Sequence, residues 1–157
     1  MQVPVGLCEE YLEEFEQIYD MLPRQLIHRD PNPSTVIRRM SGGKEVWGFI
    51  DFELSERNIR IYDPCYAATA IFSEWFMAGK EREVTKWPDV YKNIMTGYDR
   101  VVGLTEEERR AVPYVILTNQ LICVAWFADQ GKYEEMYRAN IKMTEWIFAH
   151  FEELRLM

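Results

Sequence analysis

The chain has 157 residues, 48% of them hydrophobic and 28% charged, a composition typical of a single soluble globular domain. Its 26 acidic and 18 basic side chains give a net charge of -8. We therefore expect neither a nucleic-acid partner nor binding to an anionic membrane, because both would repel this protein.

The cysteines and the apolar segments point to a cytoplasmic protein. Cys8, Cys65 and Cys123 lie far apart without a CxxC pair, which fits neither a disulfide framework nor a zinc site. Acidic residues precede any apolar run, so we expect no signal peptide. The most apolar stretch, 112–128, contains Pro113 and is shorter than the roughly 20 residues that a bilayer requires. We expect a buried helix there.

The first predicted element is an amphipathic helix over residues 8–22. Its apolar residues, including Tyr11, Phe15 and Ile18, recur at steps of three and four, with glutamates on the opposite face. Pro23 ends the helix.

A loop and a β-hairpin follow this helix. Residues 25–35 contain two prolines and short polar residues, which predict a loop. Residues 36–40 and 46–51 are β-prone, and the two glycines between them favour a tight turn. The Gly-Gly-Lys of this turn lacks the spacing of a phosphate-binding loop. Residues 52–58 are predicted to be irregular.

The remainder is predicted to be helical, and the segment after Gly103 has a clear start signal. Thr105 and Glu108 have the spacing of a capping box, in which each side chain accepts from the other residue's backbone N–H. The predicted helices cover residues 64–78, 88–102, 105–128 and 132–154.

The residues that carry chemistry flank the hairpin. His28-Arg29-Asp30 precedes the first strand, and Asp51 ends the second. Because the strands are antiparallel, both positions lie at the same end of the hairpin. Phosphoryl transfer uses such a pair, one carboxylate to orient a substrate hydroxyl and another to hold magnesium on the phosphates.

Three segments together resemble the aminoglycoside phosphotransferase and choline kinase family of the protein-kinase-like fold. Residues 28–35, HRDPNPST, resemble its HxDxxxxN catalytic loop. Residues 49–53, FIDFE, resemble its apolar-apolar-Asp-Phe metal motif. Residues 62–68, YDPCYAA, resemble its downstream GDPxYDLA element, with Ala67 in place of the family's helix aspartate.

The resemblance implies a role for each motif residue. Asp30 would be the catalytic aspartate, and His28 would brace its loop. Asp51 would be the principal magnesium ligand. Thr35 stands where the family has a magnesium-binding asparagine, so it becomes a candidate for the metal and for the bound nucleotide. Glu53 is a further candidate metal ligand, although a loop-bracing role is the favoured reading. Asn32, beside two prolines, is interpreted as a turn residue.

The resemblance also implies the fold and the activity. We expect a mainly helical α+β domain over residues 1–157, the C-terminal lobe of a kinase-like fold. Its catalytic segment would be 26–69 and its substrate-side helical part 70–157, with the nucleotide-binding N-lobe absent because no glycine-rich loop precedes His28. The implied activity is transfer of the ATP γ-phosphate, with Mg²⁺, to a small-molecule hydroxyl. Acidic side chains would favour a cationic substrate. We expect the isolated chain to be nearly inactive.

Two other functions compete with this one. A pseudokinase-like interaction protein would keep the fold without catalysis. A metal-dependent hydrolase is less favoured, because only His28 and His150 could supply imidazole ligands. We also expect a homodimer or a complex with a separate N-lobe chain, formed through the first helix or the hairpin. The alternative is that the apolar face of the first helix is covered by the C-terminal helices.

Overall fold

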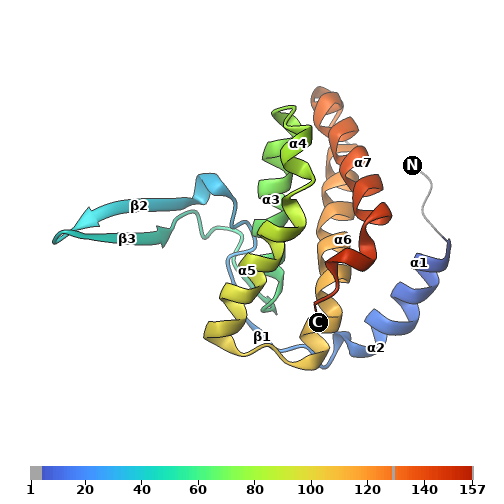
Figure 1. Ribbon diagram of the computed structural model, residues 1–157, viewed down its shortest axis with the longest axis horizontal. Helices are drawn as coiled ribbons and strands as arrows, with labels where there is room; N and C mark the ends of the chain where they lie inside the picture. Colours follow the sequence, from blue (N-terminus) through green and yellow to red (C-terminus); the bar gives the residue numbers. More distant parts are fainter. Residues whose placement is uncertain (1–4, 129, 157) are drawn as a thin grey trace.

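The computed structural model describes residues 5–128 and 130–156, and Figure 1 shows a body of packed helices from which a long β-hairpin projects. The strands are β1 (Arg24–Ile27), β2 (Val36–Ser41), β3 (Lys44–Phe49) and β4 (Glu56–Ile59). The helices are α1 (Val5–Glu10), α2 (Glu16–Tyr19), α3 (Tyr62–Met77), α4 (Glu81–Val84), α5 (Trp87–Val102), α6 (Glu106–Ala128) and α7 (Glu134–Ala149).

The first helix begins and ends earlier in the chain than the predicted range 8–22, and it is less regular. A π-helical turn over Tyr11–Phe15 separates α1 from α2, and the last helical residue is Tyr19. Its apolar face packs on the body of the protein, where Phe15 and Ile18 are about 95% buried. The ring of Phe15 stacks on that of Tyr114 in α6, with 5.6 Å between centroids. Phe15 and Ile18 are therefore covered by the chain's own helices, and pairing through the rest of the first helix stays a prediction.

The predicted hairpin is confirmed, and its turn uses both glycines. β2 pairs with β3 in antiparallel register from Val36 opposite Phe49 to Ser41 opposite Lys44. Gly42 and Gly43 have φ of +56° and +75°, which a two-residue hairpin turn requires and which side chains disfavour.

A second ladder lies in segments that the sequence predicts to be irregular. β1 pairs with β4, from Arg24 opposite Ile59 to Ile27 opposite Glu56. The predictions of a loop from residue 25 and of irregular chain through residue 58 are therefore wrong at these strands. Each strand has four residues and one buried side chain, so neither carries a readable alternation of apolar and polar residues.

The helical part agrees closely with the predicted ranges. Within it, α4 was not predicted, and the last helix ends at Ala149 before a 3₁₀ turn over Phe151–Leu154. The capping box before α6 is confirmed: the Glu108 N–H donates to the Thr105 hydroxyl (3.2 Å), and the Thr105 N–H donates to the Glu108 carboxylate (2.9 Å). The largest fully buried side chains include Trp87, Tyr91, Tyr114, Phe72 and Met95.

Helix α6 is the central element of this core. By length and composition it is the one helix in the described part of the chain that could cross a bilayer. It packs against α3 and α7, and 56% of its most apolar window is buried inside the protein. The packing of α6 in the core therefore accounts for its length and its apolar composition.

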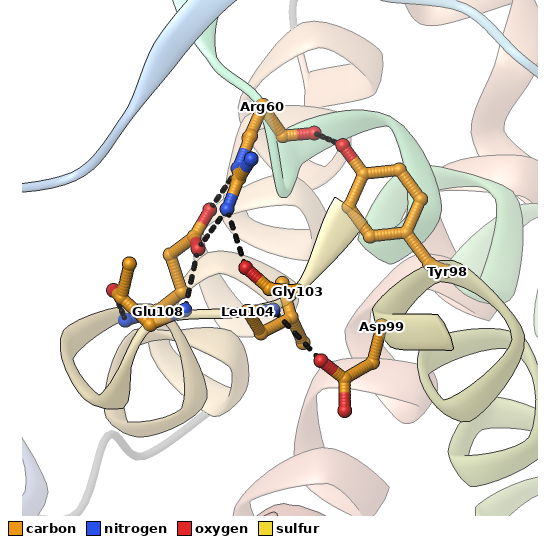
Figure 2. Close-up of polar contacts among 7 residues, drawn as sticks. Arg60, Tyr98, Asp99, Gly103, Leu104 and Glu108 are labelled. Carbon is orange, nitrogen blue, oxygen red and sulfur yellow. Dashed lines mark hydrogen bonds and ion pairs between the residues drawn. The ribbon is translucent and has the colours of Figure 1, made fainter. Parts of the chain in front are cut away.

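A buried ion pair joins the start of α6 to the segment before α3. Figure 2 shows the Arg60 guanidinium between the Glu108 carboxylate and the Gly103 carbonyl. Both nitrogen–oxygen distances to Glu108 are 2.7 Å, and the Glu108 side chain is fully buried. This bidentate contact holds the end of β4 against the helical body.

Candidate functional site

The catalytic-loop motif leaves β1 and is tied to the end of β3 by a histidine. The Nε2 of His28 lies 2.8 Å from the carbonyl oxygen of Ile50, and its Nδ1 accepts from the N–H of Asp30 at 3.3 Å. This pairing requires the neutral tautomer with its proton on Nε2. His28 thereby connects the backbone of Asp30 to the residue that precedes Asp51.

Asp63 holds the same loop from the first turn of α3. Its carboxylate accepts from the backbone N–H groups of His28 (2.8 Å) and Arg29 (2.9 Å). These bonds stabilise Arg29 in a left-handed conformation, with φ of +74°. Sequence reasoning did not single out Asp63, although an Asp-Pro pair that opens a helix was the available signal.

The Asp30 carboxylate is oriented by Asn32. Its Oδ1 accepts from the amide nitrogen of Asn32 at 3.0 Å. Burial raises the pKa of the Tyr66 phenol in α3, and the Asp30 carboxylate raises it further. Tyr66 therefore remains protonated. Asn32 is a turn residue, as predicted, because its side-chain oxygen accepts from the N–H of Ser34 at 2.9 Å.

Thr35 is buried inside the loop. Its hydroxyl lies 3.0 Å from the Asp30 carbonyl and 2.9 Å from that of Asn32, and it accepts from the Asn32 N–H at 3.1 Å. The Thr35 carbonyl accepts from the N–H of Ile50 at 3.0 Å. The hydroxyl thus closes the loop, and its role toward a metal or a nucleotide stays a prediction.

Asp51 follows directly on this anchored strand end. Ile50 is held through both its N–H and its carbonyl, so the position of the next residue is set. Asp51 is exposed and has φ of +70°. Among the described residues, Arg29 and Asp51 are the two non-glycine positions with positive φ, and each belongs to one predicted motif. Such conformations concentrate at functional sites.

The carboxylates available for a metal ion are few. Glu53 is exposed in the turn after Asp51, and its predicted metal role stays untested. Within the part of the chain that the structure describes, no three His, Cys, Asp or Glu side chains form a group that could enclose a metal. Magnesium in phosphoryl-transfer sites needs only one or two carboxylates, because substrate phosphates and water complete its shell. Asp51 is exposed, and its predicted role as a magnesium ligand stays a prediction.

Two cysteine side chains are described, and both are poor nucleophiles; that of Cys8 lies outside the described part. Cys65 is fully buried, which raises the pKa of its thiol. Cys123 in α6 is partly buried, and both burial and the charge of Asp30 raise its thiol pKa. Cys123 therefore lies within electrostatic reach of Asp30.

Comparison with known families matches residues 5–104 to the model described as the phosphotransferase enzyme family. The matched range contains every motif residue discussed above and ends just before α6. No curated protein and no solved structure matches the chain.

Proposed function

Because this chain belongs to the phosphotransferase enzyme family, we propose that it serves transfer of the γ-phosphate of ATP to a hydroxyl group of a small molecule. The observation that carries this proposal is the connection between its two motifs. His28 bonds to the backbone of Asp30 on one side and to Ile50, the neighbour of Asp51, on the other. Two carboxylates with complementary roles are thus supplied by one hydrogen-bonded unit.

Asp30 is the proposed catalytic residue. Asn32 donates to one oxygen of its carboxylate, so the group is oriented while other lone pairs remain free. A substrate hydroxyl that donates to a free lone pair is aligned toward the phosphate and can pass its proton to Asp30 as the new bond forms. His28 and Asp63 act as positioning residues, because they contact the loop backbone.

Asp51 is the proposed magnesium ligand, with Thr35 and Glu53 as subsidiary candidates. Bound magnesium would neutralise charge on the phosphates of ATP during transfer. Asp51 is exposed and follows the anchored residue Ile50, which suits a side chain that must meet a nucleotide from outside the helical body.

The exposed hairpin supports the further proposal of a second protein component. Met40, Trp47 and Phe49 on one face, and Ile37 and Val46 on the other, are between 39% and 65% exposed. A two-stranded hairpin is marginally stable by itself, and apolar patches of this kind are usually covered. We propose that a separate chain with a nucleotide-binding lobe, or a second copy, covers it. The same observation favours the alternative function, a non-catalytic interaction protein.

Phosphorus NMR tests the catalytic proposal by following ATP, ADP and new phosphate esters in the presence of Mg²⁺ and a panel of small alcohols. We expect turnover by the chain alone to be below the roughly 1–100 per second typical of kinases. Asp30→Asn should lower the residual rate by about 100-fold or more. Asp89→Asn, on the exposed side of α5, is the matched control. Equal rates in the wild type and in the Asp30→Asn variant would contradict the proposed chemistry.

The partner proposal is tested by light scattering and by co-purification with any β-rich chain encoded next to this one. We expect Trp47→Ser to weaken the association. Trp126→Ser, which removes a tryptophan of similar exposure from α6, should not. Assembly that tolerates Trp47→Ser would place the interface elsewhere.

A further inference from the structure

The hairpin of β2 and β3 has two open edges. Within the residues that the structure describes, these strands pair only with each other, and Figure 1 shows them projecting from the helical body. Every second residue of an antiparallel strand turns its backbone N–H and C=O away from its partner. Edge strands are usually protected by a proline, a bulge or a very short length, but β2 has six residues, no proline and an unbroken register from Val36 to Ser41. Its outer edge can therefore accept a further strand.

The hairpin also differs in charge from the rest of the chain. Residues 36–49 contain three basic side chains and one acidic side chain, a net charge of +2. The whole chain carries -8, which leaves -10 for the other residues. The hairpin is therefore a basic arm on an acidic body, and it attracts acidic groups that the body repels.

The uncompensated positive charge of this arm lies on one face. Arg38 is compensated, because its guanidinium pairs with Glu45 at 2.5 Å. Arg39 and Lys44 lie on the opposite face, since side chains alternate along β2 and Lys44 stands opposite Ser41 in the register. Both are exposed, and neither has an ion-pair partner among the described residues. A strand added to β2 therefore meets two free cations on this face.

A second copy of this chain does not offer a strand that matches these cations. Two-fold pairing of β2 with its own copy would place the arginines of the two copies beside one another, and like charges on neighbouring strands are destabilising. Among the other described strands, β1 contains one basic residue and no acidic one, and β3 and β4 each contain one residue of either sign. The acidic strand must come from a different chain.

An anionic membrane fits the hairpin less well than a protein strand does. The turn over residues 41–44, which projects furthest from the body, contains serine, two glycines and lysine. The exposed apolar side chains of Ile37 and Phe49 lie toward the other end of the hairpin, next to the body. They would reach a bilayer only after the polar turn had entered it, and an anionic surface would repel the acidic body.

We propose that the outer edge of β2 binds an extended acidic segment of a separate chain as a third strand. Main-chain hydrogen bonds along the edge supply affinity, and side chains at alternate positions supply specificity. The acidic side chains lie on the face of Arg39 and Lys44, beside the exposed side chain of Ile37. An acidic residue directly opposite Arg39 strengthens binding by about twofold to fivefold. This assignment gives the chemistry of the separate component in the proposed function and rests on that proposal, whereas strand addition itself is measurable without phosphate transfer.

Peptides of one length and different charge test strand addition. A capped seven-residue peptide that alternates valine with glutamate carries its three glutamates on one face of a strand. One comparison peptide has lysine in place of glutamate, and another keeps the glutamates but is methylated at every backbone nitrogen, which removes its main-chain donors. Nitrogen-15 NMR of the whole chain locates the binding. We expect the β2 amides to shift saturably with the glutamate peptide at millimolar concentration, about fivefold weaker binding or less for the lysine peptide, and no shift with the methylated peptide.

Matched variants test the role of the two free cations. Arg39→Gln together with Lys44→Gln should lower the affinity for the glutamate peptide by about fourfold or more. Arg39→Glu together with Lys44→Glu should reverse the order of the glutamate and lysine peptides. Arg100→Gln, which removes an exposed charge from α5, is the control and should leave the affinity unchanged.

Several outcomes would overturn the third strand. These are equal binding of the two charged peptides, shifts with the methylated peptide, and shifts confined to amides outside β2. Two results would instead assign the hairpin to another partner. One is sedimentation with phosphatidylserine vesicles without any peptide-induced shift, and the other is a dimer in light scattering that dissociates when Arg39→Gln and Lys44→Gln are combined.

The strand addition and the proposed function can fail separately. Phosphate transfer that depends on a partner chain, but is unchanged by Arg39→Gln combined with Lys44→Gln, would overturn the third strand and leave the proposed function standing. Peptide binding at β2 without any phosphate transfer in the presence of the partner chain would retain the edge site and overturn the proposed function.

Discussion

Loss of the Arg60 guanidinium should be among the most destabilising single changes in this chain. Arg60→Met keeps much of the side-chain stem but removes both 2.7 Å contacts to Glu108 and the 3.0 Å bond to the Gly103 carbonyl. Glu108 then remains fully buried, with the N–H of Thr105 as a partner. Breaking a buried ion pair from one side costs about 3–5 kcal/mol, because a charge is left without compensation.

Urea unfolding followed by circular dichroism measures this loss of unfolding free energy, and thermal unfolding measures the corresponding fall in Tm. For a chain of this size, about 2–4 °C in Tm corresponds to each kcal/mol, so Tm should fall by about 6–20 °C. Arg138→Met is the control, because it removes an exposed pair with Glu134 in α7 and should cost less than about 0.5 kcal/mol.

A double variant tests the physical reason. Glu108→Gln in the Arg60→Met background removes the orphaned charge and keeps an oxygen that can accept from Thr105. We expect the double variant to be more stable than Arg60→Met alone. A loss below about 1 kcal/mol in Arg60→Met, or strictly additive effects in the pair, would refute the argument from buried charge.

Three further predictions concern the turn, the site and the pH dependence of stability. Gly42→Ala should weaken the hairpin by about 1–2 kcal/mol, because φ is +56° there, whereas Gly42→Asn should weaken it less; hydrogen exchange of the hairpin amides measures both. Asp30→Asn should lower the thiol pKa of Cys123 and therefore speed its alkylation severalfold, measured in a Cys8→Ser background. An unchanged alkylation rate would show that the charge of Asp30 does not act on Cys123. Asp99 accepts from a backbone N–H and from an arginine, which lower its pKa below the ordinary value of 3.8. Its stabilising contribution is therefore present above that value and lost as the pH falls through the lower folded-state pKa, so the stability difference between the wild type and Asp99→Asn should narrow on acidification below about pH 4.

Local chemistry was sufficient to predict much of this protein. The hairpin, its glycine turn and the capping box of Thr105 and Glu108 depend on residues close together in the chain. The motif residues were likewise recognisable in the sequence, because their spacing within the loop and at the strand end is itself local. The family match over residues 5–104 agrees with that reading.

Contacts between distant residues could not be predicted in this way. The pairing of β1 with β4 joins segments about 30 residues apart, and neither strand is long enough to show a period of two. The role of Asp63 in holding the His28 loop depends on the position of α3 beside that loop, which is a tertiary contact. The sequence predicts that one face of the first helix is apolar. It does not predict which element covers that face, because hydrophobic patterning specifies burial without specifying a partner. The tertiary structure alone left the buried side chain of Asn119 without a hydrogen-bond partner among the described residues, since the pairing of a buried amide depends on side chains from other elements.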